Sequence, residues 1–174
     1  LEVWERHALT RVLPEGWTAE ALERSLVEWR SPLVDSLRRN GFHVACCALQ
    51  ATPLPLAGAL VFDLDEPSVP LTAGYACRRT MPEALEAALL EAAQSRLTEI
   101  HGARDDVATG EREAGAELQR FFSTLRPAPL RRGAAVKGWP KVIADAVVLV
   151  TVREAPLHVV KAIGIDLEES ELLR

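Results

Sequence analysis

Apolar residues spaced three and four apart mark three helices in the first part of the chain. This spacing aligns side chains on one helical face and predicts helices from Leu1 to about Val12, from Ala19 to about Arg30, and from Pro32 to Arg39. Thr18 and Ser31 stand immediately before the second and third helices, where a hydroxyl side chain caps the first backbone N–H groups. We therefore expect three short helices before the first strand.

Strand-length apolar segments follow, bounded by prolines, glycines and polar residues. The segments "FHVACCALQ" and "GALVFDL" are joined by the turn "ATPLPLA", so we expect them to pair as a hairpin. "LTAGYACR" is a third predicted strand, in which Gly74 indicates the close approach of another backbone. Near the end of the chain, "DAVVLVTV" is predicted as a buried strand and "HVVKAIGI" as a second one.

One long helix is the most clearly defined element of the sequence. Thr80 and Glu83 have the spacing of a capping box, and the helix is predicted to continue to about Ile100. Its core stripe consists of Leu85, Ala88, Leu89 and Ala92. A polar segment then leads into a further helix that ends near Leu125. This mixed order predicts the α+β fold class, with a largely antiparallel sheet packed with helices in one domain over residues 1–174.

Composition restricts the classes of function. The 174 residues are 48% hydrophobic and 26% charged, which is typical of a globular protein. The net charge of −5 provides no basic surface for nucleic acid, and no apolar run approaches the length of a membrane helix. Cys46, Cys47 and Cys77 lie in predicted strands, where we expect buried reduced thiols rather than a metal site, and this indicates a cytoplasmic protein.

Acidic side chains at helical spacing are the first candidate functional residues. Glu2 and Glu5 share one face of the first helix, where two carboxylates repel each other unless a cation lies between them. Mg²⁺ is one such cation, because it prefers hard oxygen ligands. The alternative is a solvated helix face on which Glu2 pairs with Arg6, and spacing alone favours this alternative.

The long helix carries a second, polar stripe beside its core stripe. Glu91 and Gln94 lie one turn apart on it and follow the small residues Ala84 and Ala87. Small side chains allow another backbone to come close, and the two polar side chains would then offer oxygen ligands from a single turn. The alternative is a helix edge that faces water, which the pattern alone favours.

The long helix is followed by the charged segment "HGARDDV". Arg104 supplies a fixed cation with a planar fork suited to phosphate or carboxylate, and Asp105 and Asp106 are adjacent acids. The alternative is a loop cluster of ion pairs that fastens two helices. The chain has no phosphate-binding glycine motif and no nucleophile elbow. Acidic helices therefore occur without the usual nucleotide motifs.

Two of these segments resemble the YcaO-domain family. "LEVWERHAL" resembles the E-x-x-E-R helix of that family. Residues 73–107 resemble its second signature, which is a glycine-rich strand, an "A-L-x-x-A-L-x-E-A-x-Q-x-R" helix and then "G-x-R-D-D". Proteins of this family use ATP without a conventional phosphate loop, and their acidic helices hold Mg²⁺ against the phosphates. The resemblance therefore implies ATP and Mg²⁺ as cofactors.

The resemblance also implies roles for the candidate residues. The metal ligands that it implies are Glu2, Glu5, Glu91 and Gln94. Glu91 and Gln94 would also face the nucleotide. The candidates for phosphate neutralisation or structural pairing are Arg6, Arg96 and Arg104. The two acidic helices would then form opposite walls of one nucleotide site, and no catalytic residue is assigned.

The reaction implied by the resemblance is ATP- and Mg²⁺-dependent activation of a peptide amide. It would lead to an azoline or a thioamide in a ribosomally made peptide or protein, with a peptide-clamping or accessory protein as a possible partner. The alternative is a truncated, non-catalytic YcaO-like module that binds a peptide or a partner protein.

The retained acidic side chains favour the enzyme, whereas departures from the family pattern favour the alternative. The chain starts at Leu1 inside a predicted helix, so we expect sequence that precedes it to be absent. Ile165 and Asp166 stand where the family has proline and glycine, and its usual histidine is replaced around Cys77-Arg78. We therefore expect a site that is open on one side, with apolar surface covered by a second copy or a partner chain.

Overall fold

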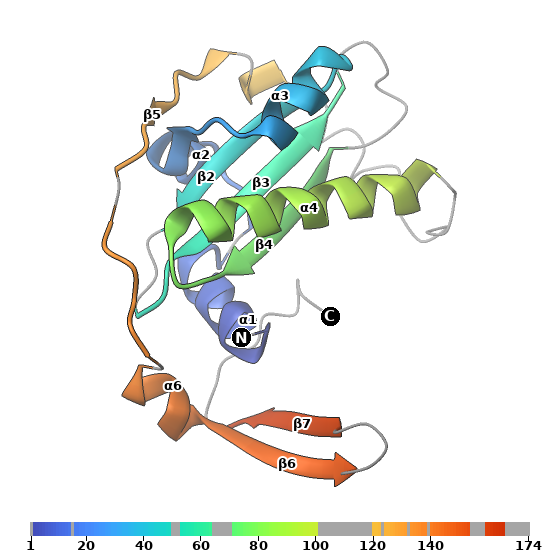
Figure 1. The fold of residues 1–174 in the computed structure, drawn as a ribbon. Helices are drawn as coiled ribbons and strands as arrows, with labels where there is room; N and C mark the ends of the chain where they lie inside the picture. Colours follow the sequence, from blue (N-terminus) through green and yellow to red (C-terminus); the bar gives the residue numbers. More distant parts are fainter. Residues whose placement is uncertain are drawn as a thin grey trace.

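The computed structural model describes residues 2–14, 16–49, 53–63, 71–100, 120–122, 124–131, 133–138, 140–153 and 159–165. Its centre is a five-stranded sheet with the strand order β4-β3-β2-β1-β5 (Figure 1). The strands are β1 Leu26–Glu28, β2 His43–Leu49, β3 Leu56–Phe62, β4 Thr72–Cys77 and β5 Ala128–Pro129. All pairs are antiparallel except β1 with β5. The predicted α+β class and the β2–β3 hairpin are confirmed.

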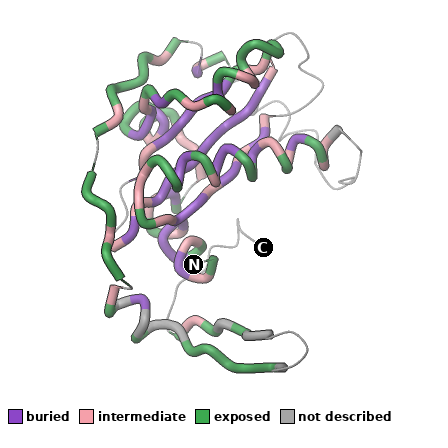
Figure 2. Tube along the Cα trace, in the orientation of Figure 1, coloured by how far each residue is buried: buried purple, intermediate pink, exposed green. Residues whose placement is uncertain are grey.

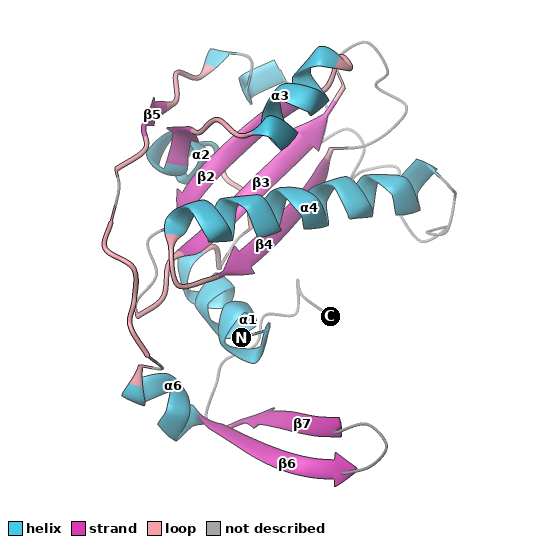
Figure 3. Ribbon diagram, viewed as in Figure 1, coloured by secondary structure: helices cyan, strands magenta, loops and turns pink. Residues whose placement is uncertain are grey.

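Helices cover both faces of this sheet (Figures 1 and 3). One face packs against α3 (Pro32–Arg39) and α4 (Met81–Ile100), through a buried cluster that includes Val34, Ala59 and Leu89. The other face packs against α1 (Glu2–Val12) and α2 (Ala19–Ser25), through two further clusters. Because side chains alternate along a strand, β2 and β3 contribute to both faces and are almost entirely buried. The sheet is therefore the middle layer of three.

The packing of α4 on β4 depends on Gly74. A Cβ atom at this position would collide with the backbone O of Ala88 and the backbone N of Ala92. Thr72 adds a hydrogen bond, because its hydroxyl donates to the carbonyl of Ala92 at 3.0 Å. The predicted close approach at Gly74 is confirmed, and it fixes the position of the helix that carries Glu91.

Local signals in the sequence correctly place the starts of α2, α3 and α4 and the end of α3. Thr80 and Glu83 accept hydrogen bonds from each other's backbone N–H at 3.3 and 3.2 Å, which is the predicted capping box. Thr18 and Ser31 cap α2 and α3 as predicted. Gly41 ends the α3 segment with a φ of +87°, a conformation in which other residues are strained. The predicted core stripe of α4 is fully buried.

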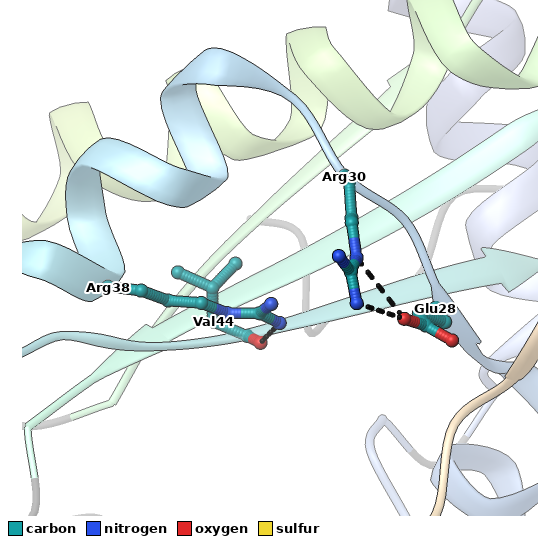
Figure 4. Close-up of polar contacts among 4 residues, drawn as sticks. All are labelled: Glu28, Arg30, Arg38 and Val44. Carbon is teal, nitrogen blue, oxygen red and sulfur yellow. Dashed lines mark hydrogen bonds and ion pairs between the residues drawn. The ribbon is translucent and has the colours of Figure 1, made fainter.

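The prediction of a helix from Ala19 to about Arg30 was wrong in its second half. The helix ends at Ser25, and the next three residues form β1, in which Leu26 and Val27 pair with β2. Pairing with a distant strand outweighs the local helical pattern there. Figure 4 shows the contacts beside this strand: Arg30 pairs with Glu28 at 3.0 Å, and Arg38 donates to the Val44 carbonyl at 3.3 Å.

A separate two-stranded sheet lies apart from the five-stranded one (Figure 1). It consists of β6 (Val147–Arg153) and β7 (Val159–Gly164), and the short helix α6 (Lys141–Ala146) precedes it. The positions of both strands match the prediction, but the prediction of a buried strand was wrong (Figure 2). Leu149 is 69% exposed and Val152 is 63% exposed, because no described layer covers this hairpin.

The remaining predictions concern cysteines and membrane helices. Cys46, Cys47 and Cys77 are buried free thiols, as predicted, and burial raises the pKa of these thiols to about 11, 12 and 12. In the described part of the chain, no helix is both long and apolar enough to cross a membrane.

Candidate functional site

The open edge of β4 is where the two acidic helices meet. Among the described strands, β4 is the end strand of the sheet, and it pairs there with β3 alone. Backbone N–H groups alternate in direction along an antiparallel strand. Arg78, just beyond β4, donates its N–H to the Pro55 carbonyl on the β3 side at 3.1 Å. The N–H groups of Cys77 and Tyr75 therefore point outward from the open edge.

Glu5 of α1 accepts one of these outward N–H groups. Its Oε2 lies 2.6 Å from the backbone N of Cys77. Trp4, Ala8 and Leu9, also on α1, are buried in the core and hold the helix against the sheet. The predicted polar stripe on the first helix therefore continues into apolar packing, and Glu5 turns from that packing toward the strand edge.

Glu91 of α4 accepts the second outward N–H group. Its Oε2 lies 3.4 Å from the backbone N of Tyr75, two residues before Cys77. Since α1 and α4 cover opposite faces of the sheet, their two carboxylates reach the same edge from opposite sides (Figure 1). The hypothesis that the two acidic helices face each other across a site thus has a physical basis in this shared edge.

The carboxylates at this edge interact electrostatically. Burial raises the pKa of Glu5, while the hydrogen bond from Cys77 lowers it, and the negative charge of Glu91 raises it further. Partial loss of hydration raises the pKa of Glu91 as well, although this residue is exposed overall, while the hydrogen bond from Tyr75 lowers it and the charge of Glu2 raises it. Arg78 acts on both carboxylates in the opposite direction. The group is therefore an acidic cluster with a net preference for an added cation.

Glu2 and Arg6 form the ion pair that the sequence offered as an alternative. Arg6 Nη2 lies 3.3 Å from Glu2 Oε1, on an exposed part of α1. Both side chains nevertheless act electrostatically on Glu91. The Glu2–Arg6 ion pair is therefore compatible with the hypothesis of a metal site, because Glu2 belongs to the acidic cluster while it pairs with Arg6.

The other candidate residues on α4 differ in position. Gln94 is exposed one turn beyond Glu91, so it lies on the same side of the helix. Arg96 is buried, with its guanidinium carbon 5.0 Å from the centre of the Phe42 ring, and the charge of Asp63 acts on it. This position favours structural pairing, the second of the two roles considered for Arg96. Arg104, with Asp105 and Asp106, lies outside the described residues.

Sequence reasoning missed the groups that bind the two carboxylates. These are the backbone N–H groups of Tyr75 and Cys77 together with the guanidinium of Arg78. A backbone donor has no side-chain signature, so the sequence could not identify the first two. The Arg78-Arg79 pair at the end of the strand was a usable signal, because a cation there follows a predicted strand and precedes the capping box.

The chemistry of the donors fits Mg²⁺ bound together with phosphate. Among the described residues, no group of three or more His, Cys, Asp or Glu side chains is placed to hold a metal ion. Mg²⁺ is commonly bound by one or two carboxylates, with phosphate oxygens and water completing its octahedron. Glu5 and Glu91 each use one oxygen for the strand edge and retain the other. The cluster thus fits a metal that arrives with a nucleotide.

Two surface hollows lie elsewhere on the sheet. One of about 640 Å³ is lined by residues that include Glu28, Arg38 and Phe122, and one of about 910 Å³ by residues that include Arg24 and Met81. Neither is lined by Glu5 or Glu91. The assignment of the site therefore depends on charge and hydrogen bonding, and the shape of these hollows does not contribute to it.

Solved structures with a similar fold include an archaeal YcaO protein and a bacterial synthetase. The YcaO structure from Methanopyrus kandleri, bound with AMPPCP and Mg²⁺, has a TM-score of 0.66 and 20% identity, over 94% of this chain and 49% of that one. The E. coli microcin synthetase McbBCD complex has a TM-score of 0.52 and 12% identity, over 80% of this chain and 44% of that one. The same complex with pro-MccB17 bound has a TM-score of 0.56 and 14% identity, over 92% and 48%.

The chain thus spans about half the length of these solved structures, and at such identities they show the fold alone. No curated protein sequence matches the chain. A family model described as YcaO cyclodehydratase, ATP- and Mg²⁺-binding, matches residues 1–163 and so includes both acidic helices. ATP and Mg²⁺ are therefore the cofactors of the family, as the resemblance implied. The chain belongs to the YcaO family.

Proposed function

We propose that this chain supplies the nucleotide- and metal-binding part of an enzyme that activates a peptide amide with ATP. The observation that carries this proposal is the convergence of Glu5 and Glu91 on adjacent outward N–H groups of β4. Two helices from opposite faces of the sheet thereby present carboxylates at one edge. Membership of the YcaO family supports ATP and Mg²⁺ as the ligands.

The proposed roles follow from the chemistry of the side chains. Mg²⁺ held by these residues would neutralise the phosphates of ATP, and phosphoryl transfer requires mainly such charge compensation together with positioning. Glu5 and Glu91 are the proposed direct metal ligands, and Glu2 and Gln94 are proposed to act on the metal through its water ligands, because no three acidic side chains among the described residues are placed to hold one ion together. Arg6 is a proposed phosphate contact, and Arg104 is a further one from sequence alone. The edge N–H groups orient Glu5 and Glu91 so that the second oxygen of each remains available.

The proposed reaction transfers the terminal phosphoryl group of ATP to the oxygen of a peptide amide. A cysteine, serine or threonine side chain, or an external sulfide, then attacks the carbon of the same amide. The amide oxygen leaves with the phosphoryl group as phosphate, and ADP is the other product. An internal nucleophile gives an azoline ring, whereas sulfide gives a thioamide.

The proposed partners are a peptide or protein substrate and an accessory protein. A microcin synthetase complex, and the same complex with pro-MccB17 bound, are among the structures with a similar fold, and this supports partners of these two kinds. The exposed apolar side chains of the β6–β7 hairpin support contact with a further polypeptide. The same hairpin favours a second candidate function, which is a non-catalytic module that binds a peptide or partner protein.

Thermal unfolding with and without Mg·ATP tests the proposal. Ligand at about a hundred times its dissociation constant stabilises the folded state by about 2.7 kcal/mol. We expect this stabilisation from Mg·ATP, a much smaller one from ATP without Mg²⁺, and little or none in the Glu91→Gln variant. Glu86→Gln is the matched control, because Glu86 is an exposed glutamate on the same helix.

Mass spectrometry of a cysteine-containing peptide after incubation with Mg·ATP, with and without added sulfide, tests the chemistry. Loss of one water identifies an azoline, and replacement of oxygen by sulfur identifies a thioamide. A full-length protein that is not stabilised by Mg·ATP would refute the enzymatic proposal and leave the binding module as the function. If Mg·ATP stabilises the protein but no ATP is turned over in the presence of its partner proteins, the enzymatic proposal would likewise be refuted.

A further inference from the structure

Arg78 lies at the acidic cluster although no motif assigns it a role. It follows β4 directly, and its Nη1 donates to the Cys77 carbonyl at 2.7 Å. The same nitrogen lies 3.9 Å from Oε2 of Glu5. The side chain of Arg78 is 40% exposed, whereas that of Glu5 is 14% exposed. The Cys77 carbonyl therefore holds a guanidinium beside Glu5, and Arg78 is the more exposed partner of this pair.

The charges at the cluster nearly balance. Three carboxylates and two guanidinium groups act on one another there, which leaves a formal charge of −1 when all are ionised; they belong to Glu2, Glu5, Glu91, Arg6 and Arg78. Arg6 pairs with Glu2 at 3.3 Å. Arg78 is consequently the cation that acts on both Glu5 and Glu91 from the end of the strand.

A cation in this position affects two ligands in opposite directions. It repels a bare divalent ion that approaches Glu5, because like charges at short range disfavour binding. It attracts the phosphates that accompany the ion, since the planar guanidinium has donors that match phosphate oxygens. An acidic cluster without this arginine would bind the bare metal more readily.

We propose that Arg78 couples metal binding to nucleotide binding, so that the cluster takes up the metal–nucleotide complex in preference to the bare metal ion. This inference rests on the nucleotide site proposed above and adds a residue to it. It makes Arg78 a determinant of specificity for a divalent cation bound to a polyphosphate. In the absence of nucleotide, Arg78 remains the counter-ion of Glu5.

Two other roles for Arg78 make different predictions. If Arg78 were only a counter-ion that the metal displaces, its removal would strengthen the binding of both the bare metal and the metal–nucleotide complex. If it only fastened the end of β4, its removal would lower the melting temperature and weaken both ligands together. The proposed coupling alone predicts changes of opposite sign.

The test measures Mn²⁺, ATP and Mn·ATP separately on the full-length protein. Electron paramagnetic resonance measures the concentration of free Mn²⁺ and so gives the affinity for the bare metal. Calorimetry measures the affinity for the nucleotide with Mn²⁺ and, with a chelator present, without it. We expect Arg78→Gln to bind Mn²⁺ alone about fivefold more tightly and Mn·ATP about tenfold more weakly than the parent. Arg78→Lys keeps the charge and loses the fork, so it should match the parent for Mn²⁺ and fall between the two proteins for Mn·ATP.

Arg30→Gln is the matched control. Arg30 also pairs with a glutamate, Glu28 at 3.0 Å, but it lies at the β1 side of the sheet (Figure 4). This variant should bind all three ligands as the parent does. If Arg78→Gln does not fold, Arg78→Lys provides the test. If Arg78 were only a structural counter-ion, lysine would replace it without loss of Mn·ATP affinity.

The outcomes separate this inference from the proposed function. A parent protein that binds no Mn·ATP would overturn both. A parent that binds Mn·ATP, with an Arg78→Gln variant whose two affinities stay constant or move in the same direction, would overturn the role of Arg78 and leave the nucleotide site intact. Opposite changes in the two affinities, with an unchanged melting temperature, would support the coupling.

Discussion

Substitution of Gly74 by alanine tests how closely the fold and the candidate site depend on each other. The new Cβ would collide with the backbone O of Ala88 and the backbone N of Ala92, and helix backbone cannot rotate aside as a side chain can. Helix α4 would have to move away from β4. The backbone at Gly74 is not in the left-handed region, so steric overlap is the cause of any destabilisation.

The expected cost can be estimated from the contacts at this position. Forcing a methyl group into a packed core costs about 1–3 kcal/mol. Movement of α4 also weakens the hydrogen bond from Thr72 to the Ala92 carbonyl, which contributes about 1 kcal/mol. Replacing glycine stabilises the folded state by about 0.5–1 kcal/mol, because the unfolded chain loses freedom. We expect a net loss of about 1–3.5 kcal/mol in the free energy of unfolding.

Two other glycines provide a graded comparison in denaturant unfolding experiments. At Gly133 an added Cβ meets no atom within 4 Å, so alanine there should change stability very little. At Gly58 it meets the Trp17 ring at 2.7 Å, and a side chain can shift, so the loss should be about 1 kcal/mol. If Gly74→Ala costs no more than Gly133→Ala, the backbone contact does not hold α4 in place and this reasoning is wrong.

Three further predictions concern titration, thiol reactivity and assembly. The folded protein raises the pKa of Glu91 above its ordinary value of 4.5, so the contribution of this group makes the free energy of unfolding fall as pH rises above about 4.5. Glu91→Gln removes this contribution and should therefore gain stability relative to the parent as pH rises above about 4.5 in chemical unfolding, and a constant difference between the two proteins across this range would contradict the raised pKa. The three cysteines, with pKa values raised to about 11 or 12, should react with a thiol reagent at about pH 8 only after denaturation, and fast labelling of any one of them in the native protein would contradict its burial. The apolar β6–β7 hairpin should mediate self-association, so Leu149→Lys should shift a sedimentation profile toward monomer, whereas a parent that stays monomeric at high concentration would count against this.

The parts of the fold that follow local rules were predictable from sequence. The capping box at Thr80, the proline-led start of α3 and the glycine after it depend on residues within one turn of each other. Gly74 was also informative, since a glycine in a strand indicates a close backbone approach. These signals gave the ends of α3 and α4 and the contact between α4 and β4.

The errors arose where partners distant in sequence determine the structure. Leu26 and Val27 continue the helical pattern of α2, yet they pair with Cys47 and Cys46, about twenty residues further on. The apolar pattern of β6 indicated burial, but the described structure leaves Leu149 exposed. A hydrophobic pattern indicates that a side chain favours burial. It does not identify the element or chain that buries the side chain, because that depends on the rest of the assembly.

The candidate site shows the same division between local and distant information. Helical spacing predicted that Glu91 and Gln94 share one side of α4, and both are exposed there. The contact between Glu5 and the Cys77 backbone spans 72 positions in the sequence and involves a donor without a side-chain signature. The family resemblance supplied the connection between the two acidic helices, which residue spacing alone could not.

The open edge of β4 connects these observations in physical terms. An uncovered edge strand exposes N–H groups that can pair with another chain, and proteins block such edges with charge or with covering elements. Here two carboxylates from helices on opposite faces take the N–H groups of Tyr75 and Cys77. The contacts that close the edge also bring two negative charges together, and this concentration of charge favours a divalent cation. A change that frees the edge N–H groups should therefore weaken metal binding and expose a strand to aggregation at the same time.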